Sequence, residues 1–164
     1  IIAYGENVQD TAVLTVRVPG LILLPDNPAY EKVGGTQYHH GPPGWNEDHN
    51  HYGQPYVIQA IQEMASRYRA YGGEIIRIND LSLPYGGLFD INGNWQPPHD
   101  EHRGGNNADI SGAGRGGRFL RENVMLYSVI PRVEKMLGVG IVWLFHERHY
   151  HFYFFQIGRR GGRE

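Results

Sequence analysis

The chain has 164 residues, 40% of them apolar, a formal net charge of −2 and no cysteine. This length and apolar share suit one domain with a real core and argue against a disordered chain. The charge gives no reason to expect nucleic acid or an anionic membrane as a partner. No apolar run approaches the roughly 20 residues of a membrane span. The absence of cysteine excludes disulfides and thiolate metal sites.

The N-terminal segment is expected to contain one strand. Residues 11–18 are rich in β-branched side chains, and Pro19-Gly20 ends the pattern. Residues 1–20 are therefore predicted to be either the end of an upstream β domain or an N-terminal edge strand, and residues 21–164 to form the main domain. No secretion signal is visible in this segment.

Residues 25–55 are rich in glycine and proline and are expected to form a long irregular segment. A loop of this length inside a compact domain is more often functional than not. It carries His39, His40, His49 and His51, for which solvated, capping or groove-lining positions are the default. A second metal site at His49 and His51 is the alternative.

Two helices are expected. In residues 55–71, Val57, Ile58, Ile61, Met64, Ala65 and Tyr68 recur at helical spacing, and Gly72-Gly73 follows as a stop. The second helix is predicted over residues 118–137, with a kink or restart at Pro131. Its residues available to the core are Phe119, Leu120, Val124, Leu126, Tyr127 and Ile130.

The remaining elements are expected to be strands at 74–82, 108–111, 140–145 and 149–157, and a hairpin around Asn92-Gly93. Glu147-Arg148 is expected to be the turn between the last two strands. Because strands and helices do not alternate regularly, the fold class predicted is α+β, with an antiparallel sheet of about four to six strands covered by two main helices.

Two short stretches carry the candidate chemistry. His102 and Asp109 flank one glycine-containing loop, and His149 and His151 are two apart on an expected strand, so they share a face. Imidazole nitrogen and carboxylate oxygen are typical zinc ligands, and a catalytic zinc site uses three of them and leaves one place to water. One of the two strand histidines can bind metal while the other reaches the water or the substrate.

The combined pattern HxxHxxGxxxD followed by HxxHxH resembles the zinc metallopeptidase group of D-Ala-D-Ala carboxypeptidases, dipeptidases and hedgehog-type domains. It is most similar to the penicillin-insensitive murein endopeptidases. His102, Gly105 and Asp109 match the first motif, while Asp100 and Asn107 stand where the group has serine and alanine. The resemblance implies a hedgehog/D,D-peptidase-like fold over about residues 50–157.

The resemblance also implies roles for single residues. His102, Asp109 and His151 would bind Zn²⁺, and His149 would act on the water or the tetrahedral intermediate. His99 and His146 would be supporting groups or substrate contacts. Arg148 occupies the position of a glutamate base in the dipeptidases, which favours the histidine variant, although Glu147 remains a possible base if it lies in a turn.

Two arginines, Arg103 and Arg115, are further candidates for substrate contacts. Arg115 lies in the glycine-rich stretch 112–117, where either it or Arg118 could meet a substrate carboxylate. The glycines in this stretch also match a dinucleotide-binding fingerprint, but no acidic residue at the end of a strand follows about 20 residues on, since Glu134 lies inside the expected second helix. His146-Glu147-Arg148-His149 is one residue too short for the zincin motif HExxH.

The function expected is therefore a zinc-dependent hydrolase that cleaves amide bonds in peptidoglycan cross-links or related D-amino-acid peptides. Its location would be extracellular or periplasmic. The alternative is a catalytically silent, metal-bearing binding or interaction module of the same fold. A purely structural metal site, with four protein ligands and no open position, is the third interpretation.

Overall fold

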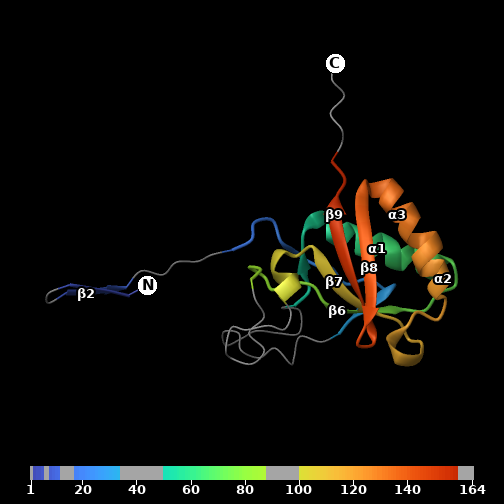
Figure 1. The fold of residues 1–164 in the computed structure, drawn as a ribbon, viewed down its shortest axis with the longest axis horizontal. Coiled ribbons are helices and arrows are strands. Elements are labelled where there is room, and N and C mark those ends of the chain that lie inside the picture. Colours follow the sequence, from blue (N-terminus) through green and yellow to red (C-terminus); the bar gives the residue numbers. More distant parts are fainter. Residues whose placement is uncertain (1, 6–7, 12–16, 34–49, 88–99, 159–164) are drawn as a thin grey trace, which may run out of the picture.

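The computed structural model describes residues 2–5, 8–11, 17–33, 50–87 and 100–158, and a five-stranded sheet lies at its centre (Figure 1). The strand order is β4-β6-β7-β9-β8. In that order the strands are Tyr30–Lys32, Ile76–Asp80, Asn107–Ser111, His149–Gln156 and Val139–His146. The predicted α+β class is confirmed.

The expectation of a purely antiparallel sheet is wrong at one edge, where β4 runs parallel to β6. The other three neighbouring pairs are antiparallel. Helix α1 (Pro55–Ala70) lies between β4 and β6 in the chain, and a helical crossover brings the chain back in the same direction. β4 also lies inside residues 25–55, which the sequence predicts to be irregular.

Two smaller sheets have two strands each. β1 (Ile2–Gly5) pairs with β2 (Val8–Thr11), and β3 (Ile22–Leu23) pairs with β5 (Tyr52–Gly53).

Most of the strand expected over residues 11–18 lies outside the described residues; of the rest, Thr11 belongs to β2, and residues 17 and 18 are not in a strand. Val18 instead donates its backbone N–H to the carbonyl of Tyr85, 2.8 Å away, outside any strand. The hairpin expected around residues 92–93 lies outside the described residues. The domain division near residue 20 stays a prediction.

Helix α1 agrees with the sequence prediction. Its predicted stripe is buried throughout: Val57, Ile58, Ile61, Met64, Ala65 and Tyr68. Gly72 follows the helix with a φ of +74°, a left-handed conformation that glycine adopts without steric cost.

The second helix begins later than expected, at Glu122 rather than at residue 118. The backbone N–H of Leu120 donates to the carboxylate of Glu74, and that of Arg121 donates to the hydroxyl of Tyr68. Tyr68 belongs to α1 and Glu74 follows it. Because these two side chains accept hydrogen bonds from the amides of Leu120 and Arg121, which the first turn of a helix would leave unpaired, the helix begins only after Arg121. The helix then runs through α2 (Glu122–Val124), η3 (Met125–Val129) and α3 (Ile130–Leu137).

The expected kink at Pro131 appears as a π-helical turn, η3, immediately before α3. Proline has no N–H to donate to the preceding turn, and a wider turn accommodates that loss. Phe119, Leu126 and Ile130 are buried as predicted, whereas Leu120 and Tyr127 are 65% and 69% exposed, so their core assignment is wrong. They lie on the outer side of the segment.

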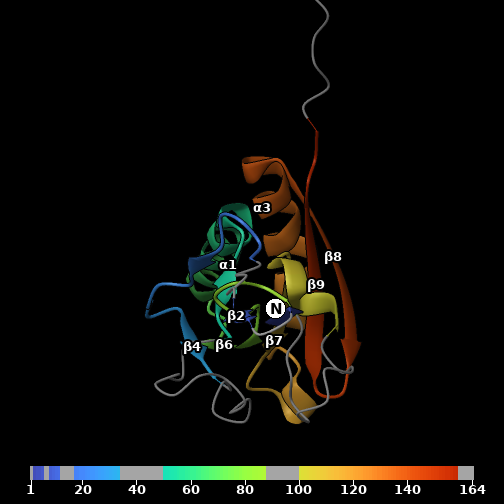
Figure 2. The same cartoon turned by 90° about the vertical axis from the view of Figure 1, so that its left-hand side faces the viewer.

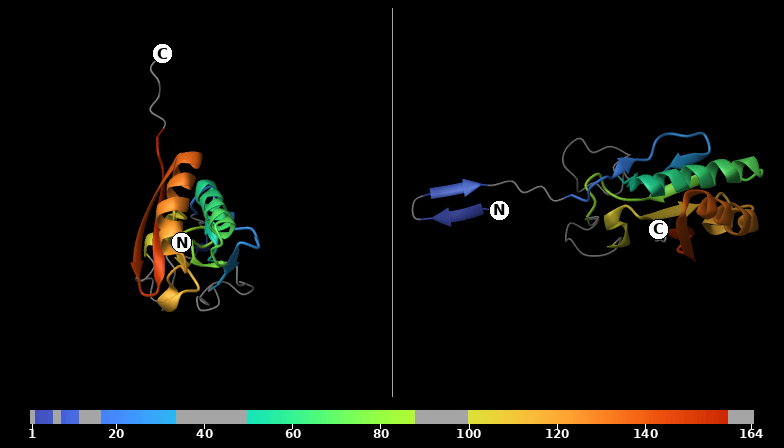
Figure 3. Two further views of the ribbon diagram at one scale, coloured as in Figure 1. Left: turned by 90° about the vertical axis from the view of Figure 1, so that its right-hand side faces the viewer. Right: turned by 90° about the horizontal axis from the view of Figure 1, so that it is seen from above.

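Helices α1 and α3 lie side by side and cover one face of the sheet (Figures 2 and 3). The covered face of β9 carries Tyr150, Phe152 and Phe154, which are fully buried. Residues of the opposite parity on β9 therefore lie on the face without helices. Among the described helices, none has the length and apolar character needed to cross a membrane.

Candidate metal centre

The three predicted ligands are brought together on the sheet face that the helices do not cover. Asp109 on β7 is the direct cross-strand partner of His151 on β9. His102 comes from η1 (Asp100–Gly104), and Gly105 then turns the chain into β7 with a φ of +69°. A Cβ at residue 105 would lie 2.3 Å from the side chain of Leu21, so only glycine fits this turn.

Asp109 is the centre of the group and is almost fully buried. Its Oδ1 lies 2.7 Å from Nδ1 of His151, and its Oδ2 lies 3.3 Å from Nε2 of His102. One ligand atom from each of the three residues lies within 4.8 Å of the others. The sequence prediction therefore selected three residues that do converge in space.

Each of the two ligand histidines has a partner for the ring nitrogen that faces away from Asp109. Nδ1 of His102 lies 2.6 Å from the carbonyl oxygen of Leu81, which can only accept, so this nitrogen carries the hydrogen. Nε2 of His151 lies 2.9 Å from the carboxylate of Glu101. This arrangement leaves Nε2 of His102 and Nδ1 of His151 facing Asp109, as in carboxylate–histidine–metal chains.

The pKa shifts describe the same electrostatic situation. Burial lowers the pKa of His102, but the hydrogen bond and charge of Asp109 outweigh burial and raise it above its usual value. Burial raises the pKa of Asp109, but hydrogen bonds with His102 and His151 hold it well below its usual range. The carboxylate is therefore ionised and attracts a positive charge to the space between the ligands.

A metal ion fits this space chemically. Two ring nitrogens and a carboxylate that converge need a cation between them, which is either a proton or a metal ion. Atoms that bind one zinc ion at about 2.0–2.1 Å lie roughly 3.3 Å apart in a tetrahedral site. The separation of 3.3 Å between Nε2 of His102 and Oδ2 of Asp109 matches that spacing, whereas the 2.7 Å between Nδ1 of His151 and Oδ1 of Asp109 is a hydrogen-bond distance. Since the three ligand atoms lie within 4.8 Å of one another, the buried group His102, Asp109 and His151 could bind a metal ion.

His149 lies at the edge of this group. Its Nε2 is 3.4 Å from Oδ2 of Asp109, and its side chain is 18% exposed. The two-residue turn Glu147–Arg148 places it directly opposite His146, whose ring centroid is 4.6 Å away. His149 can therefore reach either a water beside the three ligands or a fourth ligand position.

The turn itself is as predicted, and both of its residues have positive φ, 44° for Glu147 and 74° for Arg148. Such a backbone matches the twist of a two-residue hairpin but is uncommon for residues other than glycine, asparagine and aspartate. The residue Gly117 packs against it, and a Cβ there would lie 1.6 Å from the carbonyl oxygen of Arg148. Glu147 is exposed, and the contact with Asp109 is made by His149.

The other predicted site residues lie at the margin or outside the described part of the chain. His146, Arg103 and Arg115 are exposed, and Arg115 belongs to η2 (Arg115–Gly117). His99, His39, His40 and His49 lie outside the described residues. His51 is buried, with Nε2 3.0 Å from the carbonyl oxygen of Ile78, which is a structural position.

Two residues that matter to the site were not singled out as site residues by the sequence prediction. Glu101 contacts His151, and the fully buried Asn107 donates from Nδ2 to the backbone carbonyl of Glu101, 2.7 Å away. This bond holds η1 against β7 and so places Glu101 beside His151. The sequence offered one indication for each residue: Glu101 is adjacent to His102, and Asn107 lies two residues before Asp109.

The glycine-rich loop 112–117 has the hydrogen bonds of a closed loop. The backbone N–H of Gly112 donates to the carbonyl of Gly117, and that of Gly114 donates to the carbonyl of Arg118. Because these amides are bonded inside the loop, they are not available to cradle a phosphate. The dinucleotide interpretation therefore gains no support.

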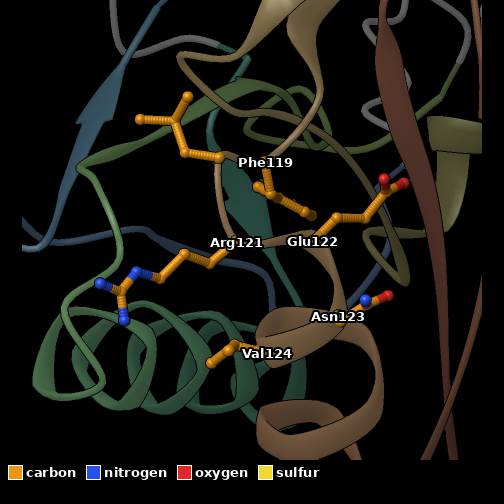
Figure 4. Close-up of a pocket in the computed structure, with 6 residues that line it drawn as sticks. Phe119, Arg121, Glu122, Asn123 and Val124 are labelled. Atoms are coloured by element: carbon orange, nitrogen blue, oxygen red, sulfur yellow. The ribbon is translucent and has the colours of Figure 1, made fainter.

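A surface pocket of about 510 Å³ lies at the start of the second helix and is lined by residues 119–124 (Figure 4). Glu122 in its wall hydrogen-bonds the hydroxyl of Tyr150, which belongs to the helix-covered face of β9. Arg121 points toward α1 (Figure 4) and donates to the carbonyl of Tyr71. The pocket is thus on the opposite side of the sheet from the metal group.

No protein-family model matches the sequence, and no curated protein matches it significantly.

Proposed function

We propose that this chain is a zinc-dependent hydrolase that cleaves amide bonds in peptidoglycan cross-links or related D-amino-acid peptides. The observation that carries the proposal is the convergence of His102, Asp109 and His151, with His149 3.4 Å from the same carboxylate. Three ligands and a neighbouring titratable group are the composition of a catalytic zinc site.

Zinc is the proposed metal because the donor set is two imidazoles and one carboxylate without thiolates. Magnesium and calcium prefer oxygen ligands alone, whereas imidazole suits zinc. The outer contacts of His102 and His151 orient both rings for such an ion, since Nε2 of His102 and Nδ1 of His151 face Asp109. A zinc ion held there lowers the pKa of its bound water to about 7 and polarises the scissile carbonyl.

The residues of the chain would divide the remaining work. His149 would take a proton from the attacking water and return it to the leaving amine, since its Nε2 lies at the margin of the centre and its ring is partly exposed. Glu101 and the Leu81 carbonyl would hold the two ligand rings in orientation. Arg115, Arg103, His146 and His99 remain proposed contacts for the substrate.

The choice of a peptidoglycan or D-amino-acid peptide substrate depends on the resemblance of the two histidine motifs to murein endopeptidases and D,D-carboxypeptidases. On the same resemblance we propose a hedgehog/D,D-peptidase-like fold for residues 21–164 and an extracellular or periplasmic location.

Digestion of purified peptidoglycan by the zinc-loaded protein tests the proposal. We expect new peptide fragments in mass spectrometry, and we expect the Asp109→Ala variant to release none. Zinc content well below one ion per chain after purification with zinc would contradict the proposal, as would intact peptidoglycan with a fully loaded protein.

The second candidate is a metal-bearing module without turnover, which the same contact of His149 also allows. A nitrogen 3.4 Å from Asp109 could complete a closed site with four protein ligands. Binding of peptidoglycan without cleavage, together with loss of zinc in His149→Ala, would establish this function instead.

A further inference from the structure

The sheet face that carries the metal group continues into an apolar strip on β8 and β9. His151 has two direct cross-strand partners, Asp109 on β7 and Leu144 on β8. Side chains of directly opposed residues lie on the same face with Cβ atoms about 4.5–5.5 Å apart. Leu144 is thus the next side chain after the metal group along this row.

The row beside it is also apolar. Tyr153 and Val142 are direct partners across β9 and β8, and the ring of Tyr153 lies 6.0 Å from that of His151. Leu144 is 65% exposed, Val142 55% and Tyr153 39%. These three side chains, which we call the apolar strip, carry no charge and lie next to His151, the most exposed of the three ligand residues.

The face continues beyond the strip in both directions. Toward Gly140 comes the ring of Phe155, which lies over Gly140 and is 48% exposed. Toward the turn the face becomes polar at His146 and His149. The metal group therefore has a polar margin on one side and an apolar margin on the other.

We propose that the apolar strip is the subsite for an aliphatic or aromatic side chain next to the amide bond that the metal centre cleaves. This inference depends on the proposed function. A peptide whose carbonyl reaches the centre has its neighbouring side chains within a few ångströms of it, and Leu144 is the apolar group nearest in the register. Because the strip carries no charge and its only side-chain polar atom is the hydroxyl of Tyr153, a charged side chain finds no counter-charge there and a small polar one buries little surface, whereas an apolar one removes exposed surface from water.

Hydroxamates test the subsite without requiring turnover. The zinc-loaded protein is titrated with acetohydroxamate and with N-acetylated leucine, phenylalanine, serine and aspartate hydroxamates, each amino acid in L and D form. The hydroxamate group binds the metal, so differences in Kd report the side chain. We expect the leucine or phenylalanine compound of one stereochemistry to bind about 10-fold tighter than the serine compound, and Leu144→Asn to abolish most of that ratio.

Leu120→Asn is the matched control, because Leu120 is also 65% exposed but lies on the opposite side of the sheet, at the start of the second helix. It should keep the leucine-to-serine ratio of the wild type. An equal Kd for all side chains, or a ratio unchanged in Leu144→Asn, overturns the subsite while leaving the metal centre intact. Failure of acetohydroxamate to bind a zinc-loaded chain overturns the proposed function as well.

A second copy of the chain is the other possible occupant of the strip. Size-exclusion chromatography with light scattering distinguishes it, because a dimer that becomes monomeric in Leu144→Asn assigns the strip to self-association and contradicts the subsite.

Discussion

The two faces of strand β9 differ in what their side chains do. Tyr150, Phe152 and Phe154 pack beneath the helices and are fully buried, while His149 and His151 on the other face surround Asp109. Alternation along one strand separates the core from the chemistry by a single residue. We therefore expect changes on the covered face to affect stability first, and changes on the open face to affect metal binding first.

The largest effect on stability is expected from Phe152→Ala on the covered face. The ring is fully buried, and its removal leaves a cavity, so the free energy of unfolding should fall by about 3–5 kcal/mol. Urea denaturation of the zinc-free protein, followed by circular dichroism, measures it. A loss below about 1 kcal/mol would mean that β9 does not pack as described.

A change to a ligand on the open face, His102→Ala, should mainly affect zinc. We expect at least about a 100-fold increase in the Kd for zinc, because one of three ligands is lost. The loss of a ligand should weaken zinc binding more than the loss of a residue that only hydrogen-bonds a ligand. Competition with a chromophoric chelator gives the Kd. The zinc-free variant should keep the wild-type far-UV spectrum, and unchanged zinc affinity would exclude His102 as a ligand.

A change of Glu101, which contacts His151 but does not face the metal, should weaken zinc binding less than the loss of a ligand does. Glu101→Gln retains the size of the side chain but removes the charge 2.9 Å from Nε2 of His151, so we expect about a 10-fold weaker zinc affinity. Glu147→Gln is a suitable control, because Glu147 is an exposed carboxylate in the turn. Equal affinities for both variants would show that Glu101 does not orient the ring.

The smallest effect is expected from His146→Ala. His146 is exposed and contacts the ring of His149 rather than Asp109 itself, so the Kd for zinc should change less than about 2-fold. The same chelator competition measures it. A loss comparable to that of His102→Ala would place His146 among the ligands.

The sequence predicted helix α1, strands β6 to β9, the turn at residues 147–148 and the convergence of the three ligand residues. The helix, the strands and the turn follow from local periodicity and alternation, which depend on neighbours in the chain, whereas the choice of the three ligand residues came from the resemblance of the two histidine motifs. The parallel strand β4 could not be predicted in this way, because its pairing with β6 depends on a partner more than 40 residues away. Its three residues also carry no alternating pattern.

The late start of the second helix and the role of Glu101 also depend on distant groups. The backbone amides of Leu120 and Arg121 donate hydrogen bonds to Glu74 and Tyr68, and residues 118–122 alone do not indicate these acceptors. Glu101 lies beside His151 because Asn107 on β7 holds η1 against that strand. Such contacts between elements are set by tertiary packing, which overrides local propensity.

Zinc titration of the wild type, His151→Ala and His149→Ala tests the central claim most directly. The claim is that three residues hold the metal and that His149 remains available for proton transfer. It predicts one zinc per chain in the wild type and at least about a 100-fold weaker zinc affinity in His151→Ala. In His149→Ala the zinc affinity should change by less than about 10-fold, but the rate of peptidoglycan cleavage should fall by about 10²-fold or more. Equal losses of zinc in the two variants would contradict the claim, because they would show a closed site with four protein ligands.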